Sequence, residues 1–461
     1  MKSNFRKYVF CYLLLFFILF FIYFPYLAKW SLNGDELLAV DLPSNYNLKS
    51  ALSNFTFNGP GHYQPLIAIF IKFYRFFLPN FALIHFVNLL LFTFVPFLLF
   101  ICLELLLPSF LSFLLAAAFS LSPIFYFHIF AINAFANTVM LSISLCLVYL
   151  LLKTWKKPKD SYVYLSTLLF TVSIFIKETF LINFYLVLLI TFVRFKNDIK
   201  KTLKIVIPLV VLIMVFFFIR SKSLGNNNIY YTYILSFYKL KETTLLFISW
   251  LFNYPLGWQY GVHLPIPKLY EASIVINVFV VLTTLSFLFY KKPIFFAAVG
   301  AGFVITLLPY LFLSRILVFH FDLTYLGLFL GIVLSLSLLY ESKMKLSLLM
   351  IFLLLLIQSI TVSVTLPQWT KYSFVGESHE IASNFIQVIT KAEIENFSRL
   401  CIINHFKGSW PTQDGMLAKY ISQKPLQIFS TSSLTVPKEC LHDNSLVLKN
   451  EDKKYYLLLE Q

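Results

Sequence analysis

Long runs of apolar residues recur along this 461-residue chain and restrict what it can fold into. A helix of about 20 apolar residues is long enough to cross the hydrocarbon core of a bilayer. Because 59% of the residues are hydrophobic and only 13% are charged, the chain carries more apolar surface than a soluble fold can bury. We therefore expect an all-α polytopic membrane protein. The expected spans, about eleven, are residues 8–28, 82–107, 109–130, 137–152, 162–176, 180–195, 203–218, 273–290, 293–313, 321–340 and 346–364.

Lysine and arginine cluster in the short segments between these runs. The clusters lie at residues 2–7, 153–159, 194–204, 291–292 and 343–345. If eleven spans alternate from a cytoplasmic N-terminus, all five clusters fall in the cytoplasm, as the positive-inside rule requires. The first loop (31–65), the long loop (221–272) and the tail from residue 366 then lie on the non-cytoplasmic face. We expect the inner membrane of a bacterium, with membrane lipids and no nucleic acid as partners of the basic residues.

The tail, residues 366–461, has a different pattern from the membrane part, residues 1–365. Helical and strand-like stretches alternate in it. The helical stretches are 378–392 and 414–422, and the strand-like ones are 400–404, 426–429, 445–448 and 455–459. This predicts a small α/β domain on the non-cytoplasmic side. Cys401 and Cys440 would meet an oxidising compartment there, so a disulfide is one reading, and a free Cys401 thiol in an apolar strand is the other.

The first loop places two adjacent carboxylates, Asp35 and Glu36, ahead of the sequence His-Tyr-Gln-Pro at residues 62–65. Flanking helices would hold such a loop at a fixed height above the bilayer, where a general base can work. The simpler interpretation is that the two acids only solvate the loop and have no catalytic role. His62 could complete a divalent-cation site with both acids, or hydrogen-bond an acid or a phosphate without metal. We favour the second arrangement and assign no metal ligand.

Further polar elements follow the acids in a set order. Residues 66–78 form a short apolar stretch interrupted by two basic residues, which predicts a helix lying in the membrane interface. His85 and Asn88 are then spaced for one face of a helix, where they would bridge helices, and residues 176–179 read Ile-Lys-Glu-Thr. This series, within residues 8–365, resembles the C-type glycosyltransferases, and most closely the protein O-mannosyltransferase group with its TPR-carrying branch.

The resemblance implies transfer of a sugar from a polyprenyl-phosphate carrier to an acceptor glycan, lipid or protein on the non-cytoplasmic face. Asp35 would take the proton of the acceptor hydroxyl, with Glu36 as the second choice or as the neighbour that raises the pKa of Asp35. Cations at the outer ends of spans would neutralise the leaving lipid phosphate. The candidates are Lys177, Arg315 and His320. For Lys177 the alternatives are snorkelling to the interface and neutralisation by Glu178.

Substrate contacts are expected in the first loop and in the long loop. The candidate residues are His62, Tyr63, Gln64, Trp258, Tyr260 and His263. Gln64 stands where the family's Tyr-Arg-Pro has an arginine, so the donor phosphate must be met elsewhere. No TPR repeats follow the membrane part. The aromatic residues at 253–263 are interleaved with amides, which suits stacking on a carbohydrate, although aromatic residues also form ordinary interfacial belts.

Other functions stay open. The sequence lacks glycine-rich nucleotide loops, zinc spacings and a Ser-His-Asp order, which disfavours a cytoplasmic nucleotide-sugar donor. A transporter or flippase of lipid-linked saccharides would share the hydrophobicity, but such proteins usually show paired halves with broken helices. A polymerase or ligase would place its decisive polar residues in a large late loop such as 221–272. His128, Asn133 and Asn137 are taken to lie at an outer helix turn with no further role.

Overall fold

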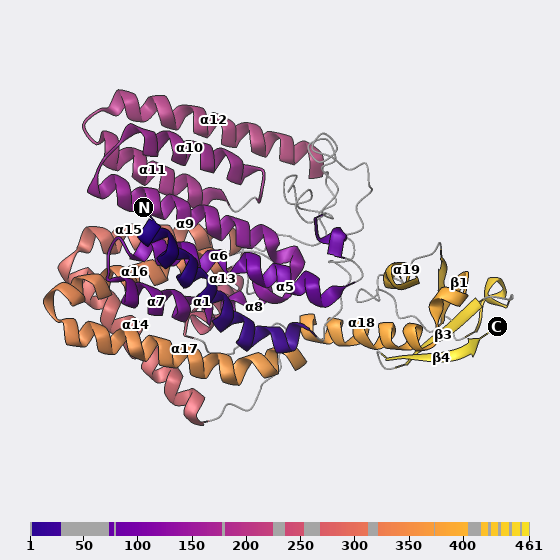
Figure 1. Cartoon of the computed structure of the whole chain (residues 1–461). Helices are drawn as coiled ribbons and strands as arrows, with labels where there is room; N and C mark the ends of the chain where they lie inside the picture. The colour runs from indigo at the N-terminus through magenta and orange to yellow at the C-terminus, as the bar shows by residue number, and fades with distance from the viewer. Residues whose placement is uncertain are drawn as a thin grey trace.

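The computed structural model describes most of the chain. The described residues are 2–28, 73–77, 80–177, 180–224, 236–252, 268–311, 321–372, 374–403, 416–422, 426–431, 435–441, 445–451 and 454–460. They form a bundle of apolar helices that is joined through α18 (Phe374–Lys391) to a small four-stranded sheet (Figure 1).

The bundle contains long and broken helices around one continuous core of leucine, phenylalanine and isoleucine. The helices are α1 (Lys2–Leu27), α5 (Phe81–Phe92), α6 (Phe94–Leu103), α7 (Ser109–Ser120), α8 (Tyr126–Phe130), α9 (Phe135–Lys156), α10 (Asp160–Ile174), α11 (Leu181–Phe195), α12 (Ile199–Leu224), α13 (Phe237–Leu251), α14 (Lys268–Lys291), α15 (Pro293–Leu307), α16 (Asp322–Ser342) and α17 (Met344–Tyr372). Short 3-10 turns are η1 (Phe73–Phe77), η2 (Pro123–Phe125), η3 (Ile132–Ala134) and η5 (Leu308–Tyr310).

Among the described residues, seven helices are long and apolar enough to cross a membrane. The number is eight if α7 and α8, which are bent by 59° relative to each other, form one broken span. The chain is therefore a multi-pass membrane protein. Each of the expected spans contains helix, but α10, α11 and α15 have 15 residues each, fewer than the roughly 20 that cross a bilayer. Eleven spans thus remain a prediction, and of the expected interfacial helix only η1 is described.

Helix α13 lies inside the segment that the sequence suggests is one long loop, residues 221–272. The segment is partly helical, because α12 continues to Leu224 and α14 begins at Lys268. The sequence Lys-Leu-Lys-Glu-Thr-Thr at residues 239–244 interrupts the apolar pattern of α13, so no span was expected there. Thr243 Oγ1 donates a hydrogen bond to the carbonyl of Leu311 at 3.0 Å, which holds α13 against the bundle.

Basic clusters gather at one end of the bundle, called the basic end below. Lys7 pairs with Glu104 in the turn between α6 and α7, and Lys156 at the end of α9 donates a hydrogen bond to the same turn. Arg194 Nη2 lies 2.6 Å from Asp160 Oδ1, which joins the end of α11 to the start of α10. The start of α9, the end of α10 and the start of α16 consequently lie at the opposite end, from which α18 leads to the sheet (Figure 1).

The tail elements predicted from local periodicity are confirmed. They are α18, β1 (Arg399–Ile403), α19 (Met416–Ser422), β2 (Gln427–Ser430), β3 (Ser445–Glu451) and β4 (Lys454–Glu460), with 3-10 turns η7 (Ile394–Asn396) and η8 (Lys438–Cys440). The strand order is β2-β1-β3-β4, with β1 parallel to β2 and β3, and β4 antiparallel to β3. The central strand β1 is apolar and mostly buried, as a strand covered on both faces should be. Phe385 of α18 contacts Tyr455 of β4, with ring centroids 4.8 Å apart.

Cys401 and Cys440 form a disulfide, with Cα atoms 6.0 Å apart. The alternative of a free Cys401 thiol is therefore wrong. Both cysteines are fully buried in a small core with Ile403 and Val447. The bond ties η8 to the central strand across 39 residues of sequence.

Replacing both cysteines with serine should destabilise the tail by about 4 kcal/mol, because the unfolded tail regains the freedom that the closed loop removes. Urea-dependent proteolysis of the tail in detergent would measure this loss. Cys146→Ser is the matched control, since Cys146 is a half-buried cysteine outside any disulfide. Equal protease resistance of the double variant and the wild-type protein would contradict the prediction.

The junction between α17 and α18 is tight. Helix α17 continues through Pro367 to Tyr372, past the domain boundary expected after residue 365. A Cβ atom added to Gly376 would lie 2.1 Å from the carbonyl oxygen of Thr370. Only glycine fits there, because a backbone oxygen cannot move aside as the end of a flexible side chain can.

Candidate functional site

Most residues expected in the site lie outside the described part of the chain. These are Asp35, Glu36, His62, Tyr63, Gln64, Trp258, Tyr260, His263, Arg315 and His320. Their roles stay predictions. Of the candidates, Lys177 is described, and it lies among residues that the sequence did not single out.

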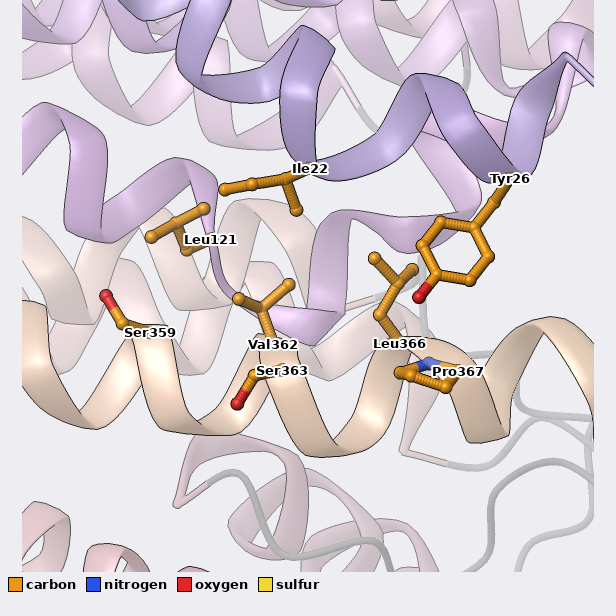
Figure 2. A pocket seen from close by; sticks show the side chains of 8 residues that line it. All are labelled: Ile22, Tyr26, Leu121, Ser359, Val362, Ser363, Leu366 and Pro367. Carbon is orange, nitrogen blue, oxygen red and sulfur yellow. The ribbon is translucent and has the colours of Figure 1, made fainter.

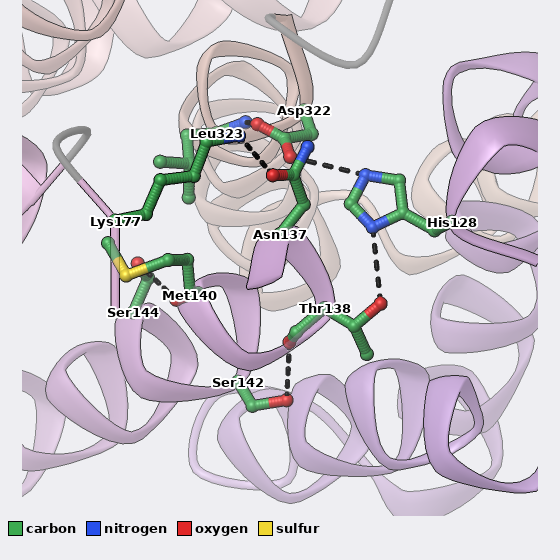
Figure 3. Close-up of polar contacts among 9 residues, drawn as sticks. All are labelled: His128, Asn137, Thr138, Met140, Ser142, Ser144, Lys177, Asp322 and Leu323. Carbon is green, nitrogen blue, oxygen red and sulfur yellow. Dashed lines mark hydrogen bonds and ion pairs between the residues drawn. The ribbon is translucent and has the colours of Figure 1, made fainter. Parts of the chain in front are cut away.

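Lys177 follows α10 at the end of the bundle opposite the basic end, and it is only 7% exposed. Its Nζ donates a hydrogen bond to Oδ1 of Asn137 in the first turn of α9 (Figure 3). The Lys177 side chain is therefore packed against α9 and does not extend into solvent. The neutralisation alternative involves Glu178, which lies outside the described residues.

A carboxylate and an imidazole converge on the same place (Figure 3). His128 Nε2, on α8, lies 3.2 Å from Oδ2 of Asp322, the first residue of α16. His128 Nδ1 lies 3.3 Å from Oγ1 of Thr138. The ring of His128 thus lies between a carboxylate on α16 and a hydroxyl on α9. His128 is 0% exposed and the other two residues 4% each, so all three are shielded from solvent.

Asn88 holds α8 in position. Its Nδ2 donates to the carbonyls of His128 and Ile129, at 3.0 Å each, and its Oδ1 accepts the hydroxyl of Tyr74 at 3.1 Å. A five-residue helix leaves its last carbonyls without partners inside the helix, and a buried carbonyl needs one. The expectation that Asn88 bridges helices is confirmed. The asparagine fixes the backbone from which His128 projects.

His128, Asn137, Thr138, Lys177 and Asp322 are called the polar cluster below. It combines a cation, a carboxylate and an imidazole from helices that are otherwise apolar, an arrangement that usually marks function because ionisable groups are costly in such surroundings. The ammonium and the amide of the cluster can hold phosphate oxygens, and the imidazole can move a proton. Among the described residues, no group of three His, Cys, Asp or Glu side chains is placed to hold a metal ion.

No family model, curated protein or solved structure matches this chain. The support for a functional site therefore comes from the contacts that its residues make in this structure. Sequence reasoning missed Asp322 and gave His128 and Asn137 no role, whereas the structure shows that His128 contacts Asp322 and that Asn137 accepts a hydrogen bond from Lys177. The available signal was that polar residues at positions 128, 137 and 322 sit within or beside spans where apolar side chains are expected.

A shallow groove of about 260 Å³ lies between α1 and α17 (Figure 2). Its lining is Ile22, Tyr26, Leu121, Ser359, Val362, Ser363, Leu366 and Pro367. Next to it, the hydroxyl of Tyr126 on α8 hydrogen-bonds Oγ1 of Thr365 on α17 at 2.7 Å. The polar cluster contributes no residue to the lining of the groove. The groove is apolar enough for a hydrocarbon chain, but it contains none of the charged groups.

Replacing Asp322 with alanine should lower the stability of the bundle by about 2 kcal/mol, because the N–H of Leu323 loses its acceptor and His128 loses the carboxylate beside it in a buried place. Thermal unfolding in detergent would measure the change. Ser337→Ala, at the other end of α16, is the control that removes a single hydrogen bond to a carbonyl. A combined Asp322→Ala and His128→Ala variant should lose less than the sum of the two single effects, and strict additivity would show that the pair is not coupled.

Proposed function

We propose that this chain is an integral membrane glycosyltransferase that moves a sugar from a polyprenyl-phosphate-linked donor to an acceptor on the non-cytoplasmic face. The observation that carries the proposal is the burial of Lys177 beside Asn137 at the end of the bundle opposite the basic end. A buried ammonium group can contact the oxygens of an anion through charge-assisted hydrogen bonds. The phosphate of a carrier lipid is an anion that lies near the level where spans end.

The chemistry assigns a role to each part of the site. As the acceptor oxygen bonds to the anomeric carbon, the bond from that carbon to the phosphate oxygen breaks, and the departing phosphate gains negative charge. Lys177 would neutralise this charge, and Asp35 would take the proton of the acceptor hydroxyl. The pair of His128 and Asp322 would position α8 and α16 around Lys177.

Two observations support the non-cytoplasmic face as the active one. Basic residues gather at the end of the bundle away from Lys177, which is the distribution that the positive-inside rule associates with the cytoplasm. The tail, which begins at the opposite end, contains the disulfide of Cys401 and Cys440, and disulfides persist in oxidising compartments. A bacterial inner membrane would place the basic end in the cytoplasm and the disulfide in an oxidising compartment.

One observation favours a second function, transport of a lipid-linked saccharide. The pair α7 and α8 bends by 59° next to Pro123, and α8 carries His128 of the polar cluster. Broken helices that present polar groups within the membrane are typical of transporters. In this alternative the polar cluster would bind the phosphate while the lipid crosses the bilayer, and no bond would break.

Purified protein reconstituted in vesicles with a polyprenyl-phosphate-linked sugar distinguishes the two functions. Mass spectrometry of the vesicles should detect the sugar-free carrier phosphate and a glycosylated acceptor if the chain is a transferase. Movement of the intact lipid-linked sugar between leaflets, with no product, would establish the second function. The absence of both results across the common hexosyl and aminosugar carriers would overturn the proposal.

A further inference from the structure

Helix α13 turns apolar side chains outward and polar side chains towards the bundle. Its outward face consists of Phe237, Tyr238, Lys241, Leu245 and Ile248. Phe237 and Tyr238 are 82% and 77% exposed, whereas Lys239 is only 7% exposed and Thr243 is fully buried. A helix in a loop that faces water shows the reverse pattern, with its polar side chains in the solvent. The outward face of α13 therefore suits apolar surroundings.

Aromatic packing holds the inward face of α13 against the bundle. The ring of Phe247 lies 5.0 Å from that of Phe303 on α15 and 5.2 Å from that of Phe321, which precedes α16. Val304, the residue after Phe303, is more than half exposed on α15. The apolar outward face of α13 thus adjoins an exposed apolar surface of a helix in the bundle.

The helices before and after α13 place it at the end of the bundle opposite the basic end. Phe216 of α12 contacts Phe180 at the start of α11, with ring centroids 5.1 Å apart, so α12 ends there. Trp155 of α9 contacts Phe295 of α15, also at 5.1 Å, so α14, whose last residue is Lys291, ends at the basic end and begins at the opposite one. Helix α13 has 15 residues and a length of about 22 Å, less than the roughly 30 Å of a hydrocarbon core.

We propose that α13 is a re-entrant helix whose outward face contacts acyl chains in the leaflet at the end of the bundle opposite the basic end. Phe237 and Tyr238 stand with Lys241 near the start of the helix, a combination typical of the level where acyl chains meet headgroups. Leu245 and Ile248 follow on the same face and suit hydrocarbon. A sugar would need polar groups that this face, apart from Lys241, does not present. The inference does not depend on the proposed sugar transfer.

Spin labels on the outward face test the proposal in the full chain, reconstituted in vesicles of phosphatidylcholine and phosphatidylglycerol without carrier lipid. Serine first replaces the cysteines outside the disulfide, which are Cys11, Cys102 and Cys146. Labels at Leu245→Cys and Ile248→Cys should be relaxed more strongly by oxygen, which concentrates in hydrocarbon, than by a water-soluble nickel complex. Leu282→Cys, on an exposed position of the span α14, should give the same sign. Leu441→Cys, equally exposed in the tail, should give the opposite sign.

Two results would overturn the proposal. Stronger relaxation by the nickel complex at positions 245 and 248 would show that water covers this face. Weak relaxation by both reagents, with an immobilised spectrum, would show that protein covers it, either a second copy or another segment of this chain. The two positions lie about one helical turn apart and serve as independent tests, so one label that disturbs packing does not remove the readout. Both results hold whether or not the chain transfers sugars.

Discussion

Replacing Lys177 with methionine is expected to lower sugar transfer in reconstituted vesicles by about 100- to 1,000-fold. Methionine keeps much of the length and apolar volume of the side chain but removes the positive charge. Lys177 is 7% exposed, so water cannot replace the lost cation effectively. Because the charge on the leaving phosphate is largest in the transition state, kcat should fall more than the affinity for the donor.

Lys239 provides the matched control for that experiment. It is also 7% exposed, and its Nζ lies 2.8 Å from Oε2 of Glu242 on the same helix, α13. Lys239→Met should therefore remove a buried lysine and an ion pair while the transfer rate stays close to that of wild-type protein. Equal losses in the two variants would mean that removal of any buried lysine harms the bundle. Full transfer by Lys177→Met would refute the role of Lys177 at the phosphate.

Replacing Asp35 with asparagine should lower transfer by about 100- to 10,000-fold, because asparagine has the shape of aspartate but cannot take a proton from the acceptor hydroxyl. Initial rates with saturating donor and acceptor would measure the loss. Glu36→Gln should have a smaller effect if Asp35 is the base, and the order of the two effects would reverse if Glu36 is.

Asp198→Asn is the control for the acid-to-amide change. Asp198 lies beside the basic end, where its Oδ1 accepts the backbone N–H of Lys201 and this hydrogen bond lowers the pKa of the carboxyl. Asparagine caps a helix about as well as aspartate, so α12 should keep its first turn. Transfer by Asp198→Asn should match wild-type protein. A wild-type rate in Asp35→Asn would exclude the proposed base.

Local patterns predicted the parts of the fold that depend on local sequence. The alternation of helix and strand in the tail gave every element of the four-stranded sheet, because each strand is a short apolar run between turn residues. The sequence does not predict helix α13, because the polar residues at 239–244 interrupt its apolar run. The bend between α7 and α8 was also not expected, because an apolar run of spanning length does not reveal whether packing divides it.

The polar cluster was only partly accessible to sequence reasoning. Lys177 could be selected because a cation at the end of a span is unusual by itself. His128 and Asp322 lie in separate helices far apart in the chain, and each alone resembles a residue at a span boundary. Only the packing of α8 against α16 makes them a pair. Asn88 shows the intermediate case, since its helical spacing predicted a bridge but not which carbonyls it would bind.

Gly376, near the start of α18, determines where the tail lies relative to the bundle. Helix α18 has 18 residues and is therefore about 27 Å long, so a rotation of about 10° at its base would displace the sheet by about 5 Å. Gly376 sets the angle between α17 and α18. Any side chain at this position would collide with the carbonyl of Thr370 and force the two helices apart. A single methyl group at position 376 would thus be magnified into a shift of the whole tail.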